Sequence, residues 1–547
     1  MLLALRLVNF KSIKESPQIE FGKLNILSGT NSSGKSTLIQ SILLSAQTLL
    51  SDNHDQALVL NGPLVSLGTP SDLWYNGQLS EPLGIRFTLR AAGQGVDVLY
   101  DLTFEAAQES ETPTIQLQEG YYATSPLDAA DYSGIRYIRK QLPELDPEFE
   151  AQIRAALGGA TVHDDDPLKM RSFLPSAFMI FTERVDADLW EKRFLNPFGY
   201  GKDSGEEIPQ TYADNIARIS AELKLRRFPN RVRPRVFALP ELPKFGEYIQ
   251  WAKQLTTGDF NRFTLAIHED FEKRKKEEGA VRLMSIRQDF KPEALAIFER
   301  AAESFLTMNL RYLSANRVGP TALFEVSRAD AISEVGTYGQ NLALALRQYG
   351  RTQLTYWSPT RQDDTNATLQ EAVADWLQYM GLIQRYELVD YGKLGVFLQI
   401  FVKGVSKPLD LTSVGFGTSQ VLPILVQGLL TPEGGLFIVE QPEVHLHPKL
   451  QSSLAYFFYS LSRRNVQCIV ETHSDHIVNQ LRVLVAKMPQ LRQHIRIYFA
   501  SRSPEEGTTF EEVRLGKTGA IKNWPQDFLS EADKLARELV KTALAQQ

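Results

Sequence analysis

The sequence predicts an α/β fold in which a mixed central sheet carries an N-terminal β-meander and is split by a mainly helical insertion. Short apolar runs separated by turns fill residues 1–125, and strand-like and helix-like patterns alternate again over 311–500. Between them, residues 126–310 are richer in charge and helical spacing, and their prolines and aromatic residues prevent a sustained heptad. Residues 501–547 form a C-terminal extension. At 547 residues, the chain exceeds what one core usually serves.

The first part of the chain is predicted to contain strands and one long helix. "LALRLVNF" and "LNILSG" are apolar runs bounded by turns, and "KSTLIQSILLSAQTLL" has apolar residues at helical spacing. The β-meander is predicted from "PLGIRFTLRAA" and "VDVLYDLTFEAA", with "TIQLQEGYYATSP" as a further strand.

The last part of the chain returns to alternating elements. "YELVDYGKLGVFLQIFVKG" predicts a hairpin and "SQVLPILVQGLL" a helix, while "LFIVE" and "VQCIVETHS" predict buried strands. The C-terminal extension is predicted to be a strand, a turn and an amphipathic helix.

Composition narrows the class of protein. The net charge of −6 argues against a broadly basic surface that coats nucleic acid, although it leaves room for a local basic groove. The single cysteine, Cys468, excludes an internal disulfide framework and is expected to be a packed, inert thiol. The N-terminus is typical of a first strand rather than a signal peptide, and no uncharged stretch approaches the roughly 20 residues of a membrane helix. We therefore expect a soluble cytoplasmic protein.

The strongest motif is "GTNSSGKST", Gly29–Thr37, which satisfies G-x-x-x-x-G-K-[ST] between a predicted strand and a predicted helix. Its glycines let the loop curl so that backbone N–H groups face phosphates at the positive end of the helix. Lys35 is expected to reach the β- and γ-phosphates, and the Ser36 hydroxyl to bind Mg²⁺. A glycine-rich turn that matches by chance is the alternative. The residues expected to hold ATP here are Gly29, Asn31, Ser32, Ser33, Gly34, Lys35, Ser36 and Thr37.

A second candidate lies far along the chain, at the end of "LFIVE". Four apolar residues suit a central parallel strand, and an acid at its C-terminal end lies in the crevice where ligands of such sheets bind. Glu440 is therefore the expected Mg²⁺-associated carboxylate, acting through water, with an ordinary strand-end acid as the alternative. Because so much chain separates Glu440 from Lys35, one P-loop NTPase core must be split by the insertion.

The chain resembles the ATPases grouped with structural-maintenance-of-chromosomes (SMC) and overcoming-lysogenization-defect (OLD) proteins, which share an ABC-type head. The resemblance rests on "LRLVNFKSI", "GTNSSGKSTLIQSIL", "SVGFGTSQVLPIL", "VEQPEVHLHPKLQ" and "ETHSDHIVNQLR", which occur in the order of that superfamily. It covers both ends of the chain and leaves about 126–310 unmatched. Within the superfamily, "EQPEVHLHP" and "GAIKNWPQDF" resemble a bacterial branch that includes the ATPase subunits of Septu-type anti-phage systems.

The resemblance implies a second phosphate site in "SVGFGTSQ", in the place of the ABC signature. In the family this site closes on the ATP of the opposite subunit, so a homodimer or higher even oligomer is implied. The motif departs from the usual serine-glycine-glycine-glutamine; Ser413 and Ser419 are the hydroxyls favoured for phosphate contact, and a helix N-cap is the alternative. The signature residues expected to bind are Ser413, Gly415, Gly417 and Ser419.

The resemblance also gives His473 the role of the switch histidine that senses the γ-phosphate, although a structural hydrogen-bonding histidine remains the alternative. His445 and His447 lie in the segment equivalent to the D-loop, which crosses the dimer interface. Two histidines without a nearby third ligand make a poor zinc site, so no metal is expected there.

Gln441 stands where the wider family has the glutamate that polarises the attacking water. An amide cannot take the proton but can orient water, and Glu443 could act as base if the turn through Pro442 brings it near the γ-phosphate. Either these residues support slow turnover, or ATP chiefly holds the dimer closed. We expect weak basal hydrolysis under the control of a partner.

Two further features concern partners. A basic cluster could track a phosphate backbone or dock an acidic partner, or it could equally be a solvated face or form salt bridges within the chain. Its members are Lys224, Arg226, Arg227, Arg231, Arg233 and Arg235. No paired acidic constellation of a Toprim nuclease follows His473, so any effector is expected to be a separate protein. In Septu-like systems that partner is an HNH nuclease, and "NWPQDFLSEADKLARELV" is a candidate docking or dimer element.

Three functional hypotheses follow. The first is an ATPase that dimerises around ATP and regulates a separate effector nuclease in anti-phage defence. The second is a DNA repair or recombination clamp whose insertion contacts DNA, and the third is a scaffold that ATP stabilises with little turnover.

Overall fold

The computed structural model describes residues 1–51, 56–91, 96–107, 113–126, 133–138, 300–324 and 334–525, with isolated positions beyond 525. The chain divides into two compact units, Met1–Ile138 with Ile297–Gln547, and Arg139–Ala296. Every described residue belongs to the first unit. Most of the predicted insertion, including the basic cluster at 224–235, lies outside the described residues, as does most of the predicted C-terminal helix.

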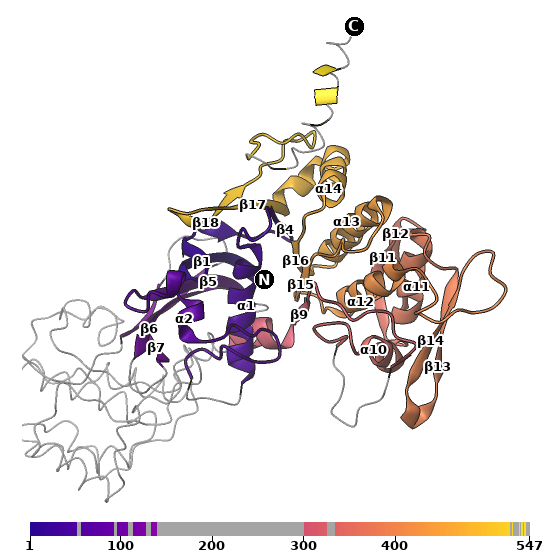
Figure 1. The fold of residues 1–547 in the computed structure, drawn as a ribbon, viewed down its shortest axis with the longest axis horizontal. Coiled ribbons are helices and arrows are strands. Elements are labelled where there is room, and N and C mark those ends of the chain that lie inside the picture. The colour runs from indigo at the N-terminus through magenta and orange to yellow at the C-terminus, as the bar shows by residue number, and fades with distance from the viewer. Residues whose placement is uncertain are drawn as a thin grey trace, which may run out of the picture. The chain divides into compact units, whose positions relative to one another are not determined.

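A 13-stranded mixed sheet dominates the first unit, in the order β8-β7-β6-β5-β1-β2-β18-β17-β4-β16-β15-β9, with β3 paired to β1 (Figure 1). Its strands are β1 Leu2–Phe10, β2 Ile13–Glu15, β3 Ile19–Glu20, β4 Leu24–Gly29, β5 Leu83–Ala91, β6 Val96–Ala107, β7 Thr114–Pro126, β8 Ser133–Ile138, β9 Leu310–Leu313, β15 Leu436–Glu440, β16 Gln467–Glu471, β17 Ile495–Ser503 and β18 Gly507–Glu512. The predicted mixed central sheet is therefore confirmed.

The sheet has a parallel half and an antiparallel half. β17, β4, β16, β15 and β9 are parallel neighbours, whereas the pairings of β5, β6, β7 and β8 are antiparallel and form the predicted meander. The parallel strands β4 and β16 are buried at every position, as expected for strands covered on both faces. β8 continues the meander past residue 125, so part of the stretch that the sequence assigned to the insertion pairs with the sheet.

Helices and smaller sheets complete the described part of the unit. A three-stranded sheet has the order β10-β14-β13, and β11 pairs with β12. The bounds of these strands are β10 Leu323–Phe324, β11 Gln353–Ser358, β12 Asp363–Thr368, β13 Arg385–Asp390 and β14 Val396–Phe401. The helical elements are α1 Lys35–Leu50, α2 Pro70–Leu73, η1 Tyr75–Gly77, η3 Glu303–Met308, α10 Leu342–Tyr349, α11 Leu369–Tyr379, η4 Gly392–Leu394, α12 Phe416–Leu430, α13 Pro448–Arg463, α14 Asp475–Lys487 and η5 Pro489–Gln493.

One hydrophobic core joins the parallel strands to the helices that follow them. Trp376 on α11 is fully buried and meets Phe457 on α13 edge-to-face, with ring centroids 5.1 Å apart. Cys468 on β16 is also fully buried in this core, as expected for an inert thiol, and burial raises the pKa of its side chain. The predicted hairpin is confirmed as β13 and β14. Among the described residues, no helix combines the length and apolarity needed to span a membrane.

Candidate nucleotide-binding site

The phosphate loop joins β4 to α1 as predicted. Gly29 and Gly34 have φ angles of 147° and 93°, in the region that favours glycine. A Cβ on Gly34 would lie 2.3 Å from the Thr508 hydroxyl oxygen, and a Cβ on Gly29 would lie 2.2 Å from the Ala500 carbonyl oxygen. Both positions therefore require glycine, because the loop runs directly against strands β17 and β18.

Lys35 points its ammonium back into this loop. It is 3% exposed, and its Nζ donates to the carbonyl oxygens of Thr30 at 2.7 Å and Gly29 at 3.2 Å. Burial lowers the pKa of Lys35, while the nearby acids Glu471 and Glu443 oppose that shift. The Lys35 ammonium is therefore held against the backbone of the phosphate loop.

The other loop residues lie around this cation. Asn31 and Ser32 are exposed, whereas Ser33 is buried with its hydroxyl 3.5 Å from the Lys35 Nζ. Thr37 is buried and its hydroxyl lies 3.1 Å from that of Ser12 on the β1–β2 turn. The structure thus brings all the predicted loop residues together.

Two acids from neighbouring strands meet at the same edge of the sheet. Glu440 ends β15, Glu471 ends β16, and the two are register partners. β16 lies between β15 and β4, so the distant ends of the chain do come together. The hydroxyl of Ser36 donates to Glu471 Oε1 at 2.9 Å. Glu471 is therefore the acid next to the phosphate loop, and the sequence interpretation missed it.

Glu471 is an unusual carboxyl group because it is only 2% exposed and its Oε2 accepts no hydrogen bond from the described residues. Burial, and then the nearby Glu440, raise the pKa of Glu471 to about 7. In the sequence, Glu471 is an acid at the end of an apolar run, and this is the same pattern that identified Glu440.

The predicted metal acid, Glu440, makes its contacts on the far side of β15. The Tyr312 hydroxyl and the Ala315 backbone N–H donate hydrogen bonds to its carboxyl group, and burial raises the pKa of Glu440. Tyr312 belongs to β9, the strand beyond β15. Glu440 thus lies at the predicted edge, one strand further from the loop than Glu471.

Arg317 is a second residue that the sequence interpretation missed. It is 7% exposed, and its guanidinium donates to the Glu440 carbonyl at 2.9 Å, the Gln441 carbonyl at 2.8 Å and the Gln420 side-chain oxygen at 3.2 Å. Burial lowers the pKa of Arg317 to about 10. It joins the end of β15 to helix α12. No local pattern separates a buried arginine of this kind from the many exposed ones.

The turn after β15 places Gln441 and Glu443 differently. Gln441 has a φ of 41°, and its backbone N–H donates to the Glu471 carbonyl at 2.7 Å. Glu443 accepts from the His473 backbone N–H at 2.7 Å and from the Thr472 hydroxyl at 2.8 Å. Burial raises the pKa of Glu443. The turn through Pro442 therefore carries Glu443 back to the end of β16.

His473 completes this edge of the sheet. Its imidazole is hydrogen-bonded to the backbone of Gly29 in the phosphate loop, and burial and Lys35 lower the pKa of the ring. His473 therefore contacts both the phosphate loop and Glu443.

The signature segment begins helix α12. Ser413 and Gly415 are exposed, while Ser419 is buried and its hydroxyl donates to the Phe416 carbonyl at 2.7 Å. Of the two favoured hydroxyls, only that of Ser413 faces solvent. Gly417 packs near Leu446, because a Cβ there would lie 3.3 Å from it.

The two histidines of the D-loop segment have other neighbours in the structure. No group of three His, Cys, Asp or Glu close enough for an ion occurs among the described residues. His445 meets Phe416 edge-to-face at 4.7 Å, and His447 caps α13 by accepting from the Lys449 backbone N–H at 3.3 Å.

The oxygen donors at the loop fit a hydrated magnesium ion. Mg²⁺ prefers hard oxygen ligands and keeps several waters, so it needs one hydroxyl and few carboxylates from the protein. Ser36 supplies the hydroxyl, and Glu440 and Glu471 supply the acids. The Oε2 atom of Glu471 accepts no hydrogen bond from the described residues, so it is available to a further donor.

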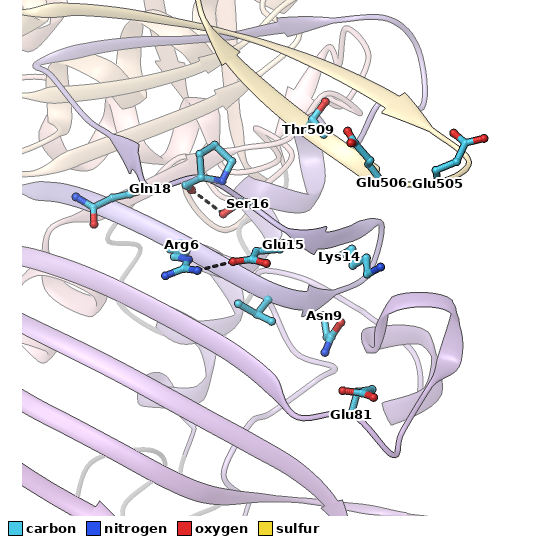
Figure 2. A pocket seen from close by; sticks show the side chains of 12 residues that line it. Arg6, Asn9, Lys14, Glu15, Ser16, Gln18, Glu81, Glu505, Glu506 and Thr509 are labelled. Carbon is cyan, nitrogen blue, oxygen red and sulfur yellow. Dashed lines mark hydrogen bonds and ion pairs between the residues drawn. The ribbon is translucent and has the colours of Figure 1, made fainter.

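A separate hollow lies along β1, β2 and the β17–β18 turn (Figure 2). It has a volume of about 750 Å³, and Arg6, Glu15, Glu81, Glu505 and Glu506 are among its lining residues. Arg6 and Glu15 form an ion pair within it. None of the predicted site residues lines it, so it is distinct from the nucleotide site.

Two family models match the chain. One, described as "AAA domain, putative AbiEii toxin, Type IV TA system", matches residues 193–479. The other, described as "AAA domain", matches residues 4–125. No curated protein matches the chain.

Solved structures of SMC head domains are similar to the chain at low identity. The Smc head domain with an extended coiled coil bound to the C-terminal domain of ScpA, from Pyrococcus furiosus, is 13% identical, with 98% of this chain and 99% of that chain covered and a TM-score of 0.31. The SmcHead bound to the C-winged helix domain of ScpA is 12% identical, with 94% and 98% covered and a TM-score of 0.35. The SMC head domain from Thermotoga maritima is 9% identical, with 94% and 99% covered and a TM-score of 0.34.

Proposed function

The chain belongs to the AAA-domain family whose model matches residues 193–479, and on this premise we propose that it is an ATPase that dimerises around ATP and hydrolyses it slowly. The observation that carries the proposal is the meeting of Lys35, Ser36, Glu471 and Glu440 at one edge of the sheet. These residues provide a cation for phosphate and oxygen donors for Mg²⁺.

In this proposal the residues have separate roles. Lys35 neutralises phosphate charge, Ser36 binds the metal, and the glycine loop offers its backbone N–H groups. A bound Mg²⁺ would neutralise phosphate charge during the reaction. Gln441 orients water, and Glu443 takes its proton. His473 connects Glu443 to the loop through its backbone N–H and its ring.

Slow turnover follows from the chemistry of Gln441 and from the contacts of Glu443. An amide has no proton-accepting role, and two hydrogen-bond donors already engage the Glu443 carboxylate. Both donors stabilise the charge of Glu443 and so oppose the rise in its pKa that burial causes. A change that moves Glu443 from Thr472 would therefore raise the rate.

The experiment is single-turnover hydrolysis by the full chain and by Gln441→Ala and Glu443→Gln. We expect wild-type hydrolysis to be slow and each variant to be slower by roughly tenfold or more, since positioned general bases contribute about 10²–10⁴. Glu433→Gln, at the opposite end of β15, is the control and should behave as wild type. Unchanged rates in both variants would remove this turn from the mechanism.

We further propose that the dimer is a homodimer in which the exposed signature residues of one copy face the ATP of the other. Ser413, Gly415 and Phe416 are exposed at the start of α12, so they are open to a second copy. Sedimentation of the Glu443→Gln variant with ATP and Mg²⁺, compared with ADP, tests this. A monomer under both conditions contradicts the ATP-bridged dimer.

We propose that a separate effector, an HNH nuclease in an anti-phage system, is the regulated partner. The support is the resemblance of the stretches at 440–448 and 519–528 to the Septu-type branch. A neighbouring reading frame for such a nuclease, and its co-purification with this chain, are the expected results. Salt-dependent DNA binding by the isolated chain, lost when the 224–235 cluster is neutralised, would instead favour a repair clamp.

A further inference from the structure

Glu471 is a buried group at this site whose hydrogen bonding is incomplete. Its side chain is 98% buried, as the 2% exposure shows, and one of its two carboxylate oxygens accepts no hydrogen bond from the described residues. Most buried polar atoms in proteins have a partner, because an unpaired one costs free energy. An unpaired oxygen in this position therefore points to a group that binds there.

The surroundings of Glu471 identify the charge of that group. Glu440 is the register partner of Glu471 on β15. Glu443 accepts hydrogen bonds from Thr472 and His473, the two residues that follow Glu471. These three acids share the edge with two cations, Lys35 and Arg317, so negative charge is in excess and a further positive charge is favoured. A phosphate ligand alone would increase the repulsion, whereas a divalent cation bound with it would relieve it.

The geometry also limits how such a cation is held. Within the described ranges no three His, Cys, Asp or Glu side chains come close enough to form a metal site by themselves. The described acids therefore do not form a cage of three ligands, which leaves inner positions for the Ser36 hydroxyl, phosphate and water. Mg²⁺ commonly binds in this way because it gives up its waters reluctantly.

We propose that Glu471 is a positioning residue for this magnesium ion. Its Oε1 accepts a hydrogen bond from the Ser36 hydroxyl, which turns a lone pair of the hydroxyl oxygen toward the cation, and its Oε2 accepts a hydrogen bond from a metal-bound water. Partners that orient metal ligands in this way set both affinity and geometry. The inference rests on the proposed ATPase function and adds a residue to its metal site.

The contacts of Glu440 explain why this role belongs to Glu471. The Tyr312 hydroxyl and the Ala315 N–H donate to the Glu440 carboxyl from the β9 side. Glu471, by contrast, ends the strand next to β4 and contacts the phosphate-loop serine directly. Glu440 therefore acts at longer range, through water, while Glu471 acts through Ser36.

The test measures metal binding without turnover. The full-length chain is titrated with a non-hydrolysable ATP analogue in EDTA and in Mg²⁺, and Mn²⁺ binding in the presence of the analogue is followed by electron paramagnetic resonance. The variants are Glu471→Gln, which keeps the shape but not the charge, Ser36→Ala, and the double variant. Glu433→Gln, an exposed acid at the opposite end of the parallel strands, is the matched control.

We expect Glu471→Gln to bind the analogue in EDTA as wild type does. We expect its Mn²⁺ affinity to fall by roughly tenfold to a hundredfold, the usual loss when an outer partner of a metal ligand is removed. The double variant should lose less than the product of the two single losses, because both act on one hydroxyl. Glu433→Gln should retain wild-type affinity, and thermal unfolding should show each variant folded.

The failure of this inference and the failure of the proposed function give different results. If the wild-type chain binds the analogue more tightly with Mg²⁺ but Glu471→Gln has a Mn²⁺ affinity within twofold of it, the inference is overturned and the ATPase proposal stands. If wild type binds no analogue under either condition, the proposed function itself is overturned. Should Glu471→Gln not fold, Glu471→Asp replaces it. Its shorter carboxylate cannot reach Ser36 at the same distance, and an unchanged Mn²⁺ affinity there would equally contradict the inference.

Discussion

The phosphate loop and the signature segment make an instructive pair, since both precede a helix at a glycine, Gly34 before α1 and Gly415 before α12. At Gly34 a Cβ would collide with Thr508 and Ser12, whereas at Gly415 it would meet nothing within 4 Å. Lys35 is 3% exposed, but Phe416 is 44% exposed. The start of α1 is therefore packed against other strands of the chain, whereas the start of α12 is exposed.

This difference shows how far the chain's own contacts cover each end of the candidate site. At the phosphate end, Ser36 bonds Glu471 on β16, and His473 bonds the backbone of Gly29 in the loop. The signature end has its glycine and Ser413 on the surface, which fits a site completed by a second copy. Arg317 connects the two ends through Gln420 on α12.

The largest effect is expected from breaking that connection with Arg317→Met. The change leaves Gln420 and the carbonyls of Glu440 and Gln441 without their buried donor, and each buried acceptor that loses its donor costs about 1–3 kcal/mol. Chemical denaturation measures the loss in the free energy of unfolding. Arg347→Met, which breaks a half-exposed ion pair with Asp390, should cost less than about 1 kcal/mol. Equal losses in the two variants would show that Arg317 is not a structural link.

The phosphate end is tested by Lys35→Ala. The variant loses a charge-assisted contact worth about 1.5–3 kcal/mol, so the affinity for ATP should fall by roughly tenfold to a hundredfold. Equilibrium titration with a fluorescent ATP analogue measures it. Lys449→Ala, an exposed lysine at the start of α13, should bind as wild type does. Retained affinity in Lys35→Ala would mean that ATP does not bind in this loop.

The signature end is tested by Ser413→Arg, which places a bulky charge on the open face. Because a clash and an unpaired charge act only in the assembled state, the ATP-dependent dimer should weaken by roughly tenfold or more while each monomer binds ATP normally. Sedimentation velocity measures the dimer. Ser80→Arg, an exposed serine on another loop, is the matched control. Dimerisation unchanged by Ser413→Arg would exclude this face from the interface.

The smallest effect is expected in the pH dependence of stability without metal. Burial raises the pKa of Glu443 above its ordinary 4.5, so the folded chain holds its proton more tightly than the unfolded chain. The free energy of unfolding should therefore fall as pH rises above about 4.5, and Glu440 and Glu471 should contribute in the same direction. Denaturation in EDTA at several pH values should show a shallower slope for Glu443→Gln. A slope identical to that of wild type would contradict a raised pKa of Glu443 in the folded chain.

The sequence by itself determined the local features of this protein. The phosphate loop with Lys35 and Ser36, the buried strand ending at Glu440, and the hairpin of β13 and β14 were all predicted, because each depends on spacing within a short stretch. The meeting of Lys35 and Glu440 was also predicted, since a split core requires it. The loop, the strand and the hairpin are encoded by neighbours in the chain, whereas the meeting of Lys35 and Glu440 followed from the order of the motifs.

Only the tertiary structure decided which side chains face one another. β16 lies between β4 and β15, so Glu471, not Glu440, meets Ser36. The same assembly buries Arg317, turns the Ser419 hydroxyl into its own helix and returns Glu443 to Thr472. Strand order and burial depend on contacts between residues hundreds of positions apart, and no local pattern records them. That is why the motifs could be named from the sequence while the partner of the serine could not.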